Sequence, residues 1–305
     1  MTIGHNLFKA VQKHVCRGGR SAGGYRLRRL RGGPDRQDAW GGGDAVWLSH
    51  AEAAEFPIET VPSNQWQVWQ EFQNMGIDMV VQPASKRRKK MLLADMDSTM
   101  IQQECIDELA DEVGVGDRVK EITARAMNGE LDFEAALDER VALLADQPAD
   151  IIDKVLKERI KFMPGGRTLI VTMKADGAYA ALVSGGFTAF TNKVAETLGF
   201  DEHHANTLLL DGDKLSGKVA RPILGREAKV EQLEKITAEL GLSENDVIAV
   251  GDGANDLGML GRAGTGVALH AKPAVQAECD VRVNHGDLTA LLFLQGYSRD
   301  EFCGL

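Results

Sequence analysis

Two acidic motifs that lie far apart in the sequence contain residue types that could carry out chemistry. Asp95 and Asp97 stand two residues apart, and Asp252 and Asp256 belong to a glycine-containing run at residues 251–256. Paired carboxylates repel an anionic substrate unless a cation is present, and Mg²⁺ prefers oxygen ligands. One carboxylate could then attack phosphorus as a nucleophile, and the other could protonate the leaving oxygen as a general acid. A strand end followed by an ordinary Asp/Ser turn gives the same pattern, so neither motif is decisive alone.

A Ser/Gly turn and a lysine lie between the two acidic motifs. Ser184 and Gly185 follow an apolar run that ends at Val183. A hydroxyl with open backbone N–H groups at a helix start can hold an anion, and Lys229 could place a compact positive charge on a phosphoryl oxygen. Each feature has a plainer interpretation, as a strand-to-helix turn and as a solvated surface lysine. The order of acidic pair, Ser/Gly turn, lysine and acidic pair nevertheless favours one shared phosphate site.

Apolar runs directly precede the polar motifs. The runs at 91–94, 178–183 and 247–250 predict buried β-strands that end where the motifs begin. Helical patterns alternate with them, which predicts a Rossmann-like α/β core with a parallel sheet and helices on both faces. Ligands of such sheets lie beyond the carboxyl ends of the strands. We further expect strands at 265–268 and 281–283, a hairpin at 208–219, and helices at 64–75, 167–175, 188–198 and 227–240.

The composition changes along the chain and divides it into parts. Residues 1–33 contain eight Lys or Arg and no Asp or Glu. Together with the many glycines, this predicts a disordered basic leader over residues 1–43, although an organelle-targeting segment and a misassigned start codon stay open. Residues 44–84 are predicted to form a small α/β appendage. The catalytic core is predicted to comprise two segments, 85–104 and 165–305, with a helical cap at 105–164 inserted between them.

The overall composition limits the classes of function. The chain has 305 residues, enough for about two domains, and its formal net charge of -10 disfavours nucleic-acid binding. No apolar run approaches the ~18 residues of a membrane span. The four cysteines form no C-x-x-C pair, so we expect neither a zinc site nor a disulfide framework, and we expect a reduced cytoplasmic setting. The sequence has no G-x-x-x-x-G-K-[ST] motif, which disfavours a P-loop nucleotide enzyme.

Together the motifs resemble those of the haloacid dehalogenase superfamily of phosphatases and, within it, the bacterial phosphoserine phosphatases. The resemblance covers residues from about 85 to 295. It implies that Asp95 is the nucleophile and becomes an aspartyl phosphate, while Asp97 acts first as the acid and then as the base. It also implies Mg²⁺ held by the carboxylates of Asp95 and Asp252 and by the backbone carbonyl of Asp97. Phosphoryl-binding and supporting roles fall, by the same resemblance, on Ser184, Gly185, Lys229, Asn255 and Asp256.

The resemblance further implies a substrate, O-phospho-L-serine, whose hydrolysis to L-serine is the last step of serine biosynthesis. A selective pocket for this substrate should offer one acid and one arginine. By resemblance these are Glu104 for the ammonium and Arg140 for the carboxylate, while Met127 and Phe133 are apolar cap residues that cover the substrate. The segment before Lys229 is less typical of the family. The appendage resembles at best part of a regulatory ACT-like domain, and a homodimer is left open.

Three alternatives remain. A sibling phosphatase could use the same core on another substrate, such as phosphohomoserine or a phosphosugar. A phosphotransferase could pass the aspartyl phosphate to an alcohol instead of to water. A non-catalytic binding protein could have kept the fold, because a fold does not guarantee activity. The presence of all four polar elements disfavours a non-catalytic protein, and Glu104 with Arg140 favours an amino-acid phosphate as the substrate.

Overall fold

A six-stranded parallel sheet forms the centre of the molecule. The computed structural model describes residues 6–12, 44–127 and 130–304, with backbone alone for residues 6–12 and 127. The strand order is β12-β11-β10-β5-β6-β7, and every neighbouring pair is parallel. The predicted parallel sheet is therefore confirmed, with one strand, β7, that the sequence patterns did not indicate. The bounds are β5 (Met91–Ala94), β6 (Tyr179–Phe187), β7 (Glu202–Asn206), β10 (Val247–Gly251), β11 (Thr265–Leu269) and β12 (Val281–Val283).

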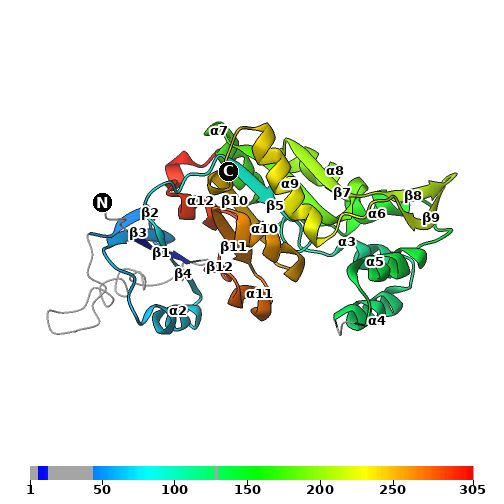
Figure 1. Cartoon of the computed structure of the whole chain (residues 1–305), viewed down its shortest axis with the longest axis horizontal. Coiled ribbons are helices and arrows are strands. Elements are labelled where there is room, and N and C mark those ends of the chain that lie inside the picture. Colours follow the sequence, from blue (N-terminus) through cyan, green and yellow to red (C-terminus); the bar gives the residue numbers. More distant parts are fainter. Residues whose placement is uncertain (1–5, 13–43, 128–129, 305) are drawn as a thin grey trace.

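Both faces of this sheet are covered by helices (Figure 1). In β5, Leu92 and Ala94 pack into one hydrophobic cluster, whereas Met91 and Leu93 pack into another. Successive side chains of a strand point to opposite faces, so a run that is apolar throughout needs cover on both sides. The first cluster contains side chains of α7 (Gly166–Ala175), α8 (Thr188–Leu198) and α12 (Ala290–Gln295), and the second those of α9 (Arg226–Glu239), α10 (Leu257–Arg262) and α11 (Pro273–Ala277).

Four helices occupy the segment predicted to be the cap, and they lie at one end of the long axis of the molecule (Figure 1). They are α3 (Cys105–Glu112), α4 (Gly116–Met127), α5 (Phe133–Ala142) and α6 (Ile151–Glu158). A core hairpin of β8 (Leu208–Asp211) and β9 (Lys214–Val219) packs against α5. Just after β9, Arg221 forms ion pairs with Glu134 and Asp138 of that helix. The hairpin and Arg221 therefore connect the cap to the core through contacts with α5.

The appendage lies at the opposite end (Figure 1). It is an antiparallel sheet in the order β2-β3-β1-β4, with α2 (Gln65–Gln73) packed on it. The strands are β1 (Asn6–Gln12), β2 (Val46–Ser49), β3 (Ala53–Ile58) and β4 (Ile77–Pro83). The prediction of a disordered leader is wrong for residues 6–12, because β1 pairs with both β3 and β4 and fills the gap between them. Residues 1–5 and 13–43 of that predicted leader lie outside the described residues.

A buried carboxylate joins the appendage to the core. Asp78 of β4 is 2% exposed and accepts backbone N–H groups of Asn284 (2.8 Å), His285 (3.0 Å) and Gly286 (2.7 Å), which follow β12. Nearby, the side-chain amide of Gln82 donates to the Leu294 carbonyl at 2.6 Å, a second contact between the appendage and the core.

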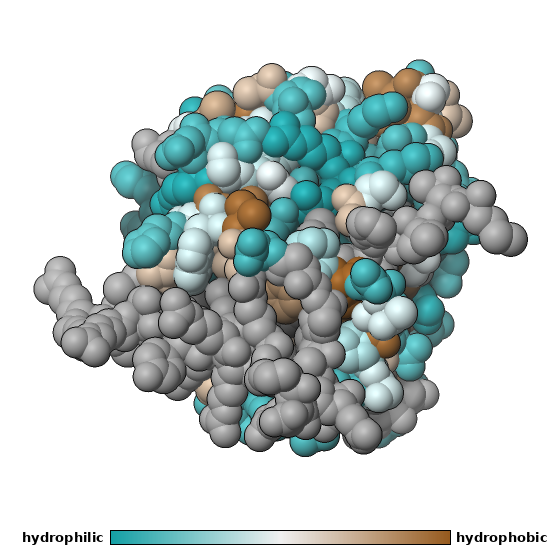
Figure 2. Space-filling view, turned by 90° about the vertical axis from the view of Figure 1, so that its left-hand side faces the viewer, coloured by the Kyte–Doolittle hydropathy of each residue, from teal (hydrophilic) through white to brown (hydrophobic). Residues whose placement is uncertain are grey.

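On the appendage side, the part of the surface that Figure 2 colours by hydropathy is largely hydrophilic with small separate hydrophobic groups. Among the described residues, no helix combines the length and apolar character needed to span a membrane.

Candidate active site

The polar motifs meet because the strands that carry them are neighbours. Strand β5 lies between β6 and β10, so Asp95, Ser184 and Asp252 all stand at the carboxyl edge of one parallel sheet. The strand before the Ser/Gly turn is longer than the sequence pattern predicted. It continues through Ser184 to Phe187, with irregular pairing to β7 after Val183.

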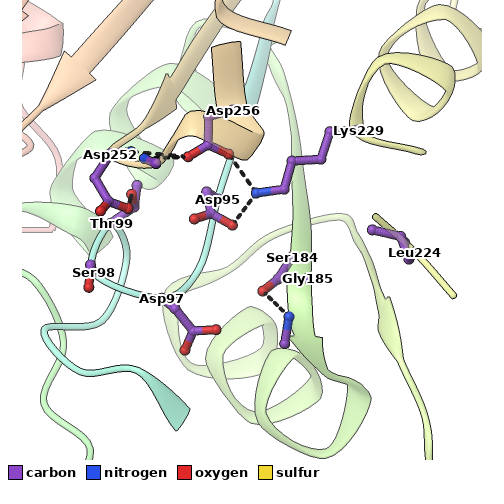
Figure 3. Close-up of polar contacts among 12 residues, drawn as sticks. Asp95, Asp97, Ser98, Thr99, Ser184, Gly185, Leu224, Lys229, Asp252 and Asp256 are labelled. Atoms are coloured by element: carbon purple, nitrogen blue, oxygen red, sulfur yellow. Dashed lines mark hydrogen bonds and ion pairs between the residues drawn. The ribbon is translucent and has the colours of Figure 1, made fainter. Parts of the chain in front are cut away.

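Lys229 is a fully buried ion of the site. It lies on α9 with 0% of its surface exposed, so the surface-lysine interpretation is wrong. Its Nζ donates to Oδ1 of Asp95 and to Oδ1 of Asp256, at 2.5 Å each, and Figure 3 shows the ammonium between the two carboxylates. Burial lowers the pKa of Lys229, but the two carboxylates outweigh this effect and leave the pKa above its ordinary value. The lysine is therefore a fixed positive charge beside Asp95.

Asp256 holds the loop after β10 in place. Its Oδ2 accepts the backbone N–H groups of Asp252 (3.1 Å) and Gly253 (2.9 Å), while Oδ1 accepts from Lys229. A Cβ atom at Gly251 would lie 2.4 Å from the Asp256 carboxyl carbon, so a side chain there would displace it. The lack of a side chain at Gly251 therefore makes room for the side chain of Asp256. Both oxygens of Asp256 are thus occupied by donors of the protein.

The acidic cluster suits a divalent cation. One carboxylate oxygen from each of Asp95, Asp252 and Asp256 lies within 4.8 Å of the others. Hard carboxylate oxygens are the ligands that Mg²⁺ prefers. Because Asp256 is engaged, Asp95 and Asp252 are the carboxylates best able to hold the ion. Thr99 donates to Oδ1 of Asp252 at 3.3 Å and orients it. Burial, and then the charges of Asp256 and Glu104, raise the pKa of Asp252 to about 6.

Asp97 is held by the first cap helix. Its Oδ1 accepts hydrogen bonds from the backbone N–H of Cys105 (2.9 Å) and from the Cys105 thiol (2.8 Å). Burial and the charge of Glu104 raise the pKa of Asp97 to about 7, although both hydrogen bonds from Cys105 oppose the shift. A carboxyl group with a pKa near neutrality can both donate and accept a proton at physiological pH.

The Ser/Gly turn is fixed by hydrogen bonds within the protein. The buried Oγ of Ser184 accepts the N–H of Gly186 at 2.9 Å. Asn206, at the end of β7, donates to the carbonyls of Gly185 (2.9 Å) and Leu224 (3.2 Å) and accepts the N–H of Leu224 at 2.7 Å. This buried amide joins the turn to the segment that leads into α9 and Lys229. Sequence reasoning missed Asn206, and its one signal was a polar residue at the end of an unrecognised strand.

A cavity of about 570 Å³ lies between the core motifs and the cap. Most of the predicted site residues line it: Asp95, Asp97, Glu104, Phe133, Arg140, Ser184, Gly185, Asp252 and Asn255. Lys229 and Asp256 are fully buried and support Asp95. The prediction for Met127 falls on the last residue of α4, whose side chain lies outside the described residues.

Glu104 and Arg140 place an acid and an arginine on the cap side of the cavity, and Asp107 of α3 is a further acid in its lining. Glu104 accepts a hydrogen bond from Ser98 Oγ at 2.7 Å, and Arg140 donates from Nε to the Ala136 carbonyl at 3.1 Å. Burial lowers the pKa of Arg140, against the charges of Asp107, Glu104 and Asp97, which raise it. The Phe133 ring lies over the turn, since a Cβ at Gly185 would be 3.3 Å from its Cζ.

The haloacid dehalogenase-like hydrolase family matches residues 92–261, more than half of the chain and all of the core motifs. The chain belongs to this family. The prediction of this family from the motifs is confirmed. A solved haloacid dehalogenase family hydrolase from Salmonella enterica serovar Typhi has a TM-score of 0.84 at 27% identity and covers 96% of this chain and 98% of its own. The similarity to that structure therefore includes the appendage as well as the core and the cap.

Similar proteins from several organisms carry the name phosphoserine phosphatase. The one from Streptomyces coelicolor is 44% identical over 229 residues, which are 74% of this chain and 56% of the relative's own length. A solved phosphoserine phosphatase, described as a phospho-aspartyl intermediate analogue, is 43% identical with a TM-score of 0.63, over 68% of this chain and 98% of its own.

Proposed function

We propose that this chain is a Mg²⁺-dependent phosphoserine phosphatase, which hydrolyses O-phospho-L-serine to L-serine and inorganic phosphate. One observation carries the proposal: a single cavity is lined by Asp95 and Asp252 from the core and by Glu104 and Arg140 from the cap side. The first pair suits a phosphate with its cation, and the second pair suits an ammonium with its carboxylate. The 44% and 43% identity to phosphoserine phosphatases supports this substrate.

The first half of the reaction transfers the phosphoryl group to the protein. A carboxylate oxygen of Asp95 forms a bond to phosphorus while the bond from phosphorus to the serine oxygen breaks. Asp97 delivers its proton to the departing oxygen. In the second half, a water molecule loses a proton to Asp97 and attacks phosphorus, which releases inorganic phosphate and regenerates Asp95. The pKa of about 7 suits Asp97 to both tasks.

Phosphoryl transfer depends mainly on positioning and on neutralising charge. Lys229, the hydroxyl of Ser184 and the N–H of Gly185 would bind phosphoryl oxygens. Mg²⁺ held by Asp95, Asp252 and the Asp97 carbonyl would neutralise further charge on the phosphoryl group. Asp256 would position Lys229, whose ammonium donates to Asp256 Oδ1 at 2.5 Å. Asn255 would complete the wall of the cavity beside them.

Substrate selection would fall on the cap side. Glu104 would bind the ammonium of phosphoserine, and Arg140 its carboxylate. Phe133 would cover the substrate and exclude water, as lids over reacting phosphates do. The same roles make a phosphosugar a poor substrate, because it would leave Glu104 and Arg140 without partners in a partly desolvated cavity.

The test is phosphate release from phosphoserine with and without Mg²⁺, beside phosphohomoserine, phosphoethanolamine and a phosphosugar. We expect the highest kcat/KM for phosphoserine and its loss in EDTA. Asp95→Asn keeps the shape of the side chain and should lower kcat by at least about a thousandfold, because the nucleophile is gone. Wild-type activity in Asp95→Asn, or a preference for the sugar ester, would refute the proposal. Transfer of phosphate to an added alcohol in place of water would make the chain a phosphotransferase.

The proposal also includes a compartment and a class of partner. The described cysteines Cys105, Cys279 and Cys303 are free, which supports a reducing compartment such as the cytoplasm. The partner is the small-molecule substrate, since the net charge of -10 disfavours nucleic acid.

A further inference from the structure

The two oxygens of Asp97 have different surroundings. Oδ1 accepts from both the backbone N–H and the thiol of Cys105, at 2.9 and 2.8 Å. Cys105 is the first residue of α3 and is 1% exposed. The first N–H groups of a helix have no partner within it and favour a negative charge nearby. The first N–H group of helix α3 therefore donates to Oδ1 of Asp97, and the Cys105 thiol is a second donor to the same atom.

The other oxygen, Oδ2, points to Gly186 and is left for the reaction. A Cβ atom at Gly186 would lie 2.6 Å from Oδ2 and 3.0 Å from the Cys105 Sγ. No hydrogen-bond donor within the described part of the chain reaches Oδ2, whereas Oδ1 has two. A protonated carboxyl group donates from one oxygen and accepts at the other. Two donors aimed at Oδ1 make it the accepting oxygen, so the proton belongs on Oδ2.

We propose that Cys105 is a positioning residue whose thiol, with its backbone N–H, fixes Asp97 so that Oδ2 carries the transferred proton. This inference rests on the proposed function, in which Asp97 is the acid. In the first half-reaction the proton moves from Oδ2 to the serine oxygen as its bond to phosphorus breaks. In the second half, Oδ2 takes a proton from the attacking water. Cys105 itself neither gains nor loses a proton.

The test separates the donor role of the thiol from its volume. Cys105→Val and Cys105→Ala both remove the donor, and Val keeps most of the volume, whereas Cys105→Thr and Cys105→Ser supply a hydroxyl. The readout is kcat/KM for phosphoserine and for 4-nitrophenyl phosphate, because this ratio reports the phosphorylation half alone. The alkoxide of serine needs a proton in order to leave, and nitrophenolate does not. Loss of this donor should therefore affect the first substrate selectively.

We expect Cys105→Val and Cys105→Ala to lower kcat/KM for phosphoserine about tenfold, the effect of one lost hydrogen bond to a reacting group. For 4-nitrophenyl phosphate the loss should stay within about twofold. Cys105→Thr or Cys105→Ser should restore most of the phosphoserine activity. If Val retains wild-type activity while Ser does not, the side chain acts by filling space and the inference is overturned. Equal losses on both substrates would overturn it as well.

Asp97→Asn distinguishes a failure of this inference from a failure of the proposed function. If Asp97→Asn selectively impairs phosphoserine and Cys105→Val does not, the assignment of Cys105 fails while the proposed function stands. If Asp97→Asn impairs both substrates equally, or neither, then Asp97 is not the acid and the proposed function fails first.

Discussion

The phosphate end and the cap end of the cavity hold their charged groups in different ways. At the phosphate end, Lys229 is fully buried and bonds two carboxylates, and Asp256 is engaged through both oxygens. At the cap end, the Arg140 guanidinium donates from Nε to the Ala136 carbonyl, and within the described residues it makes no other hydrogen bond. Groups that stabilise developing charge work best when they are fixed beforehand. Groups that select a ligand must keep bonding capacity free for it. The two ends should therefore respond differently to substitution.

The largest effect is expected at Lys229. Lys229→Met should lower kcat/KM at least about a hundredfold, because a fixed positive charge beside the nucleophile is lost. It should also lower the free energy of unfolding by about 3 kcal/mol, since Asp95 and Asp256 become buried charges without their partner. Urea unfolding in EDTA measures the second effect.

A double variant separates these two roles of Lys229. Lys229→Met with Asp256→Asn should recover part of the lost stability, because one unpaired charge is removed, and should recover no activity. If the double variant is no more stable than Lys229→Met alone, the ion pair is not the source of the loss.

The cap end should show a change in selectivity without a change in stability. Arg140→Ala should lower kcat/KM for phosphoserine about a hundredfold, because the substrate carboxylate loses a charge-assisted partner. Phosphoethanolamine, which lacks the carboxylate, should be affected no more than about threefold. Arg140→Lys serves as the matched control and should lie between. Equal losses on both substrates would show that Arg140 does not bind the substrate carboxylate.

The smallest and most conditional effect concerns Asp252. Its folded pKa is about 6, above the ordinary value of 3.8. Between these values the folded state binds a proton that the unfolded state has released, so the contribution of this group to stability falls as pH rises from about 4 to about 6. In EDTA, Asp252→Asn should therefore be more stable than wild type at pH 8, by about 2 kcal/mol, with a smaller difference at pH 5.

Mg²⁺ should reverse the sign of this comparison. A ligand that binds the folded state stabilises it, and the ion must displace the proton of Asp252 at low pH. Thermal unfolding with added Mg²⁺ should show wild type above Asp252→Asn at pH 8 and little difference at pH 5. A Mg²⁺-induced stabilisation that is equal in the two proteins would exclude Asp252 as a ligand.

The sequence predicted the parts of the fold that repeat a simple pattern. Strands β5, β6 and β10 are apolar runs that end in polar motifs, so the meeting of Asp95, Ser184 and Asp252 followed from the rules of parallel sheets. Strand β7 was missed because it contains Glu202, His203 and His204 and therefore lacks the apolar run by which the other strands were recognised. Such polar residues are tolerated because β7 lies at the edge of the sheet. Strand β1 was missed because its partners lie more than 40 residues away in the sequence.

The roles of supporting residues were harder to predict than those of the motifs. Asn206 and Cys105 act through contacts with Leu224 and Asp97, and nothing in their local sequence marks these contacts. For Asp256 the resemblance implied a phosphoryl-binding or supporting role, and its carboxylate accepts a hydrogen bond from Lys229. Predictions from motifs thus reach the residues that face the cavity, while the residues behind them depend on packing.

The carboxylate of Asp78 should also govern how the appendage separates from the core. Three successive amides after β12 are bonded by one side chain from β4. Separating the two parts would break these hydrogen bonds together and expose both the carboxylate and the three amides to solvent. Their hydrogen exchange should therefore be as slow as that of the central strands and should accelerate together in Asp78→Ala, so that the appendage unfolds with the core and not before it.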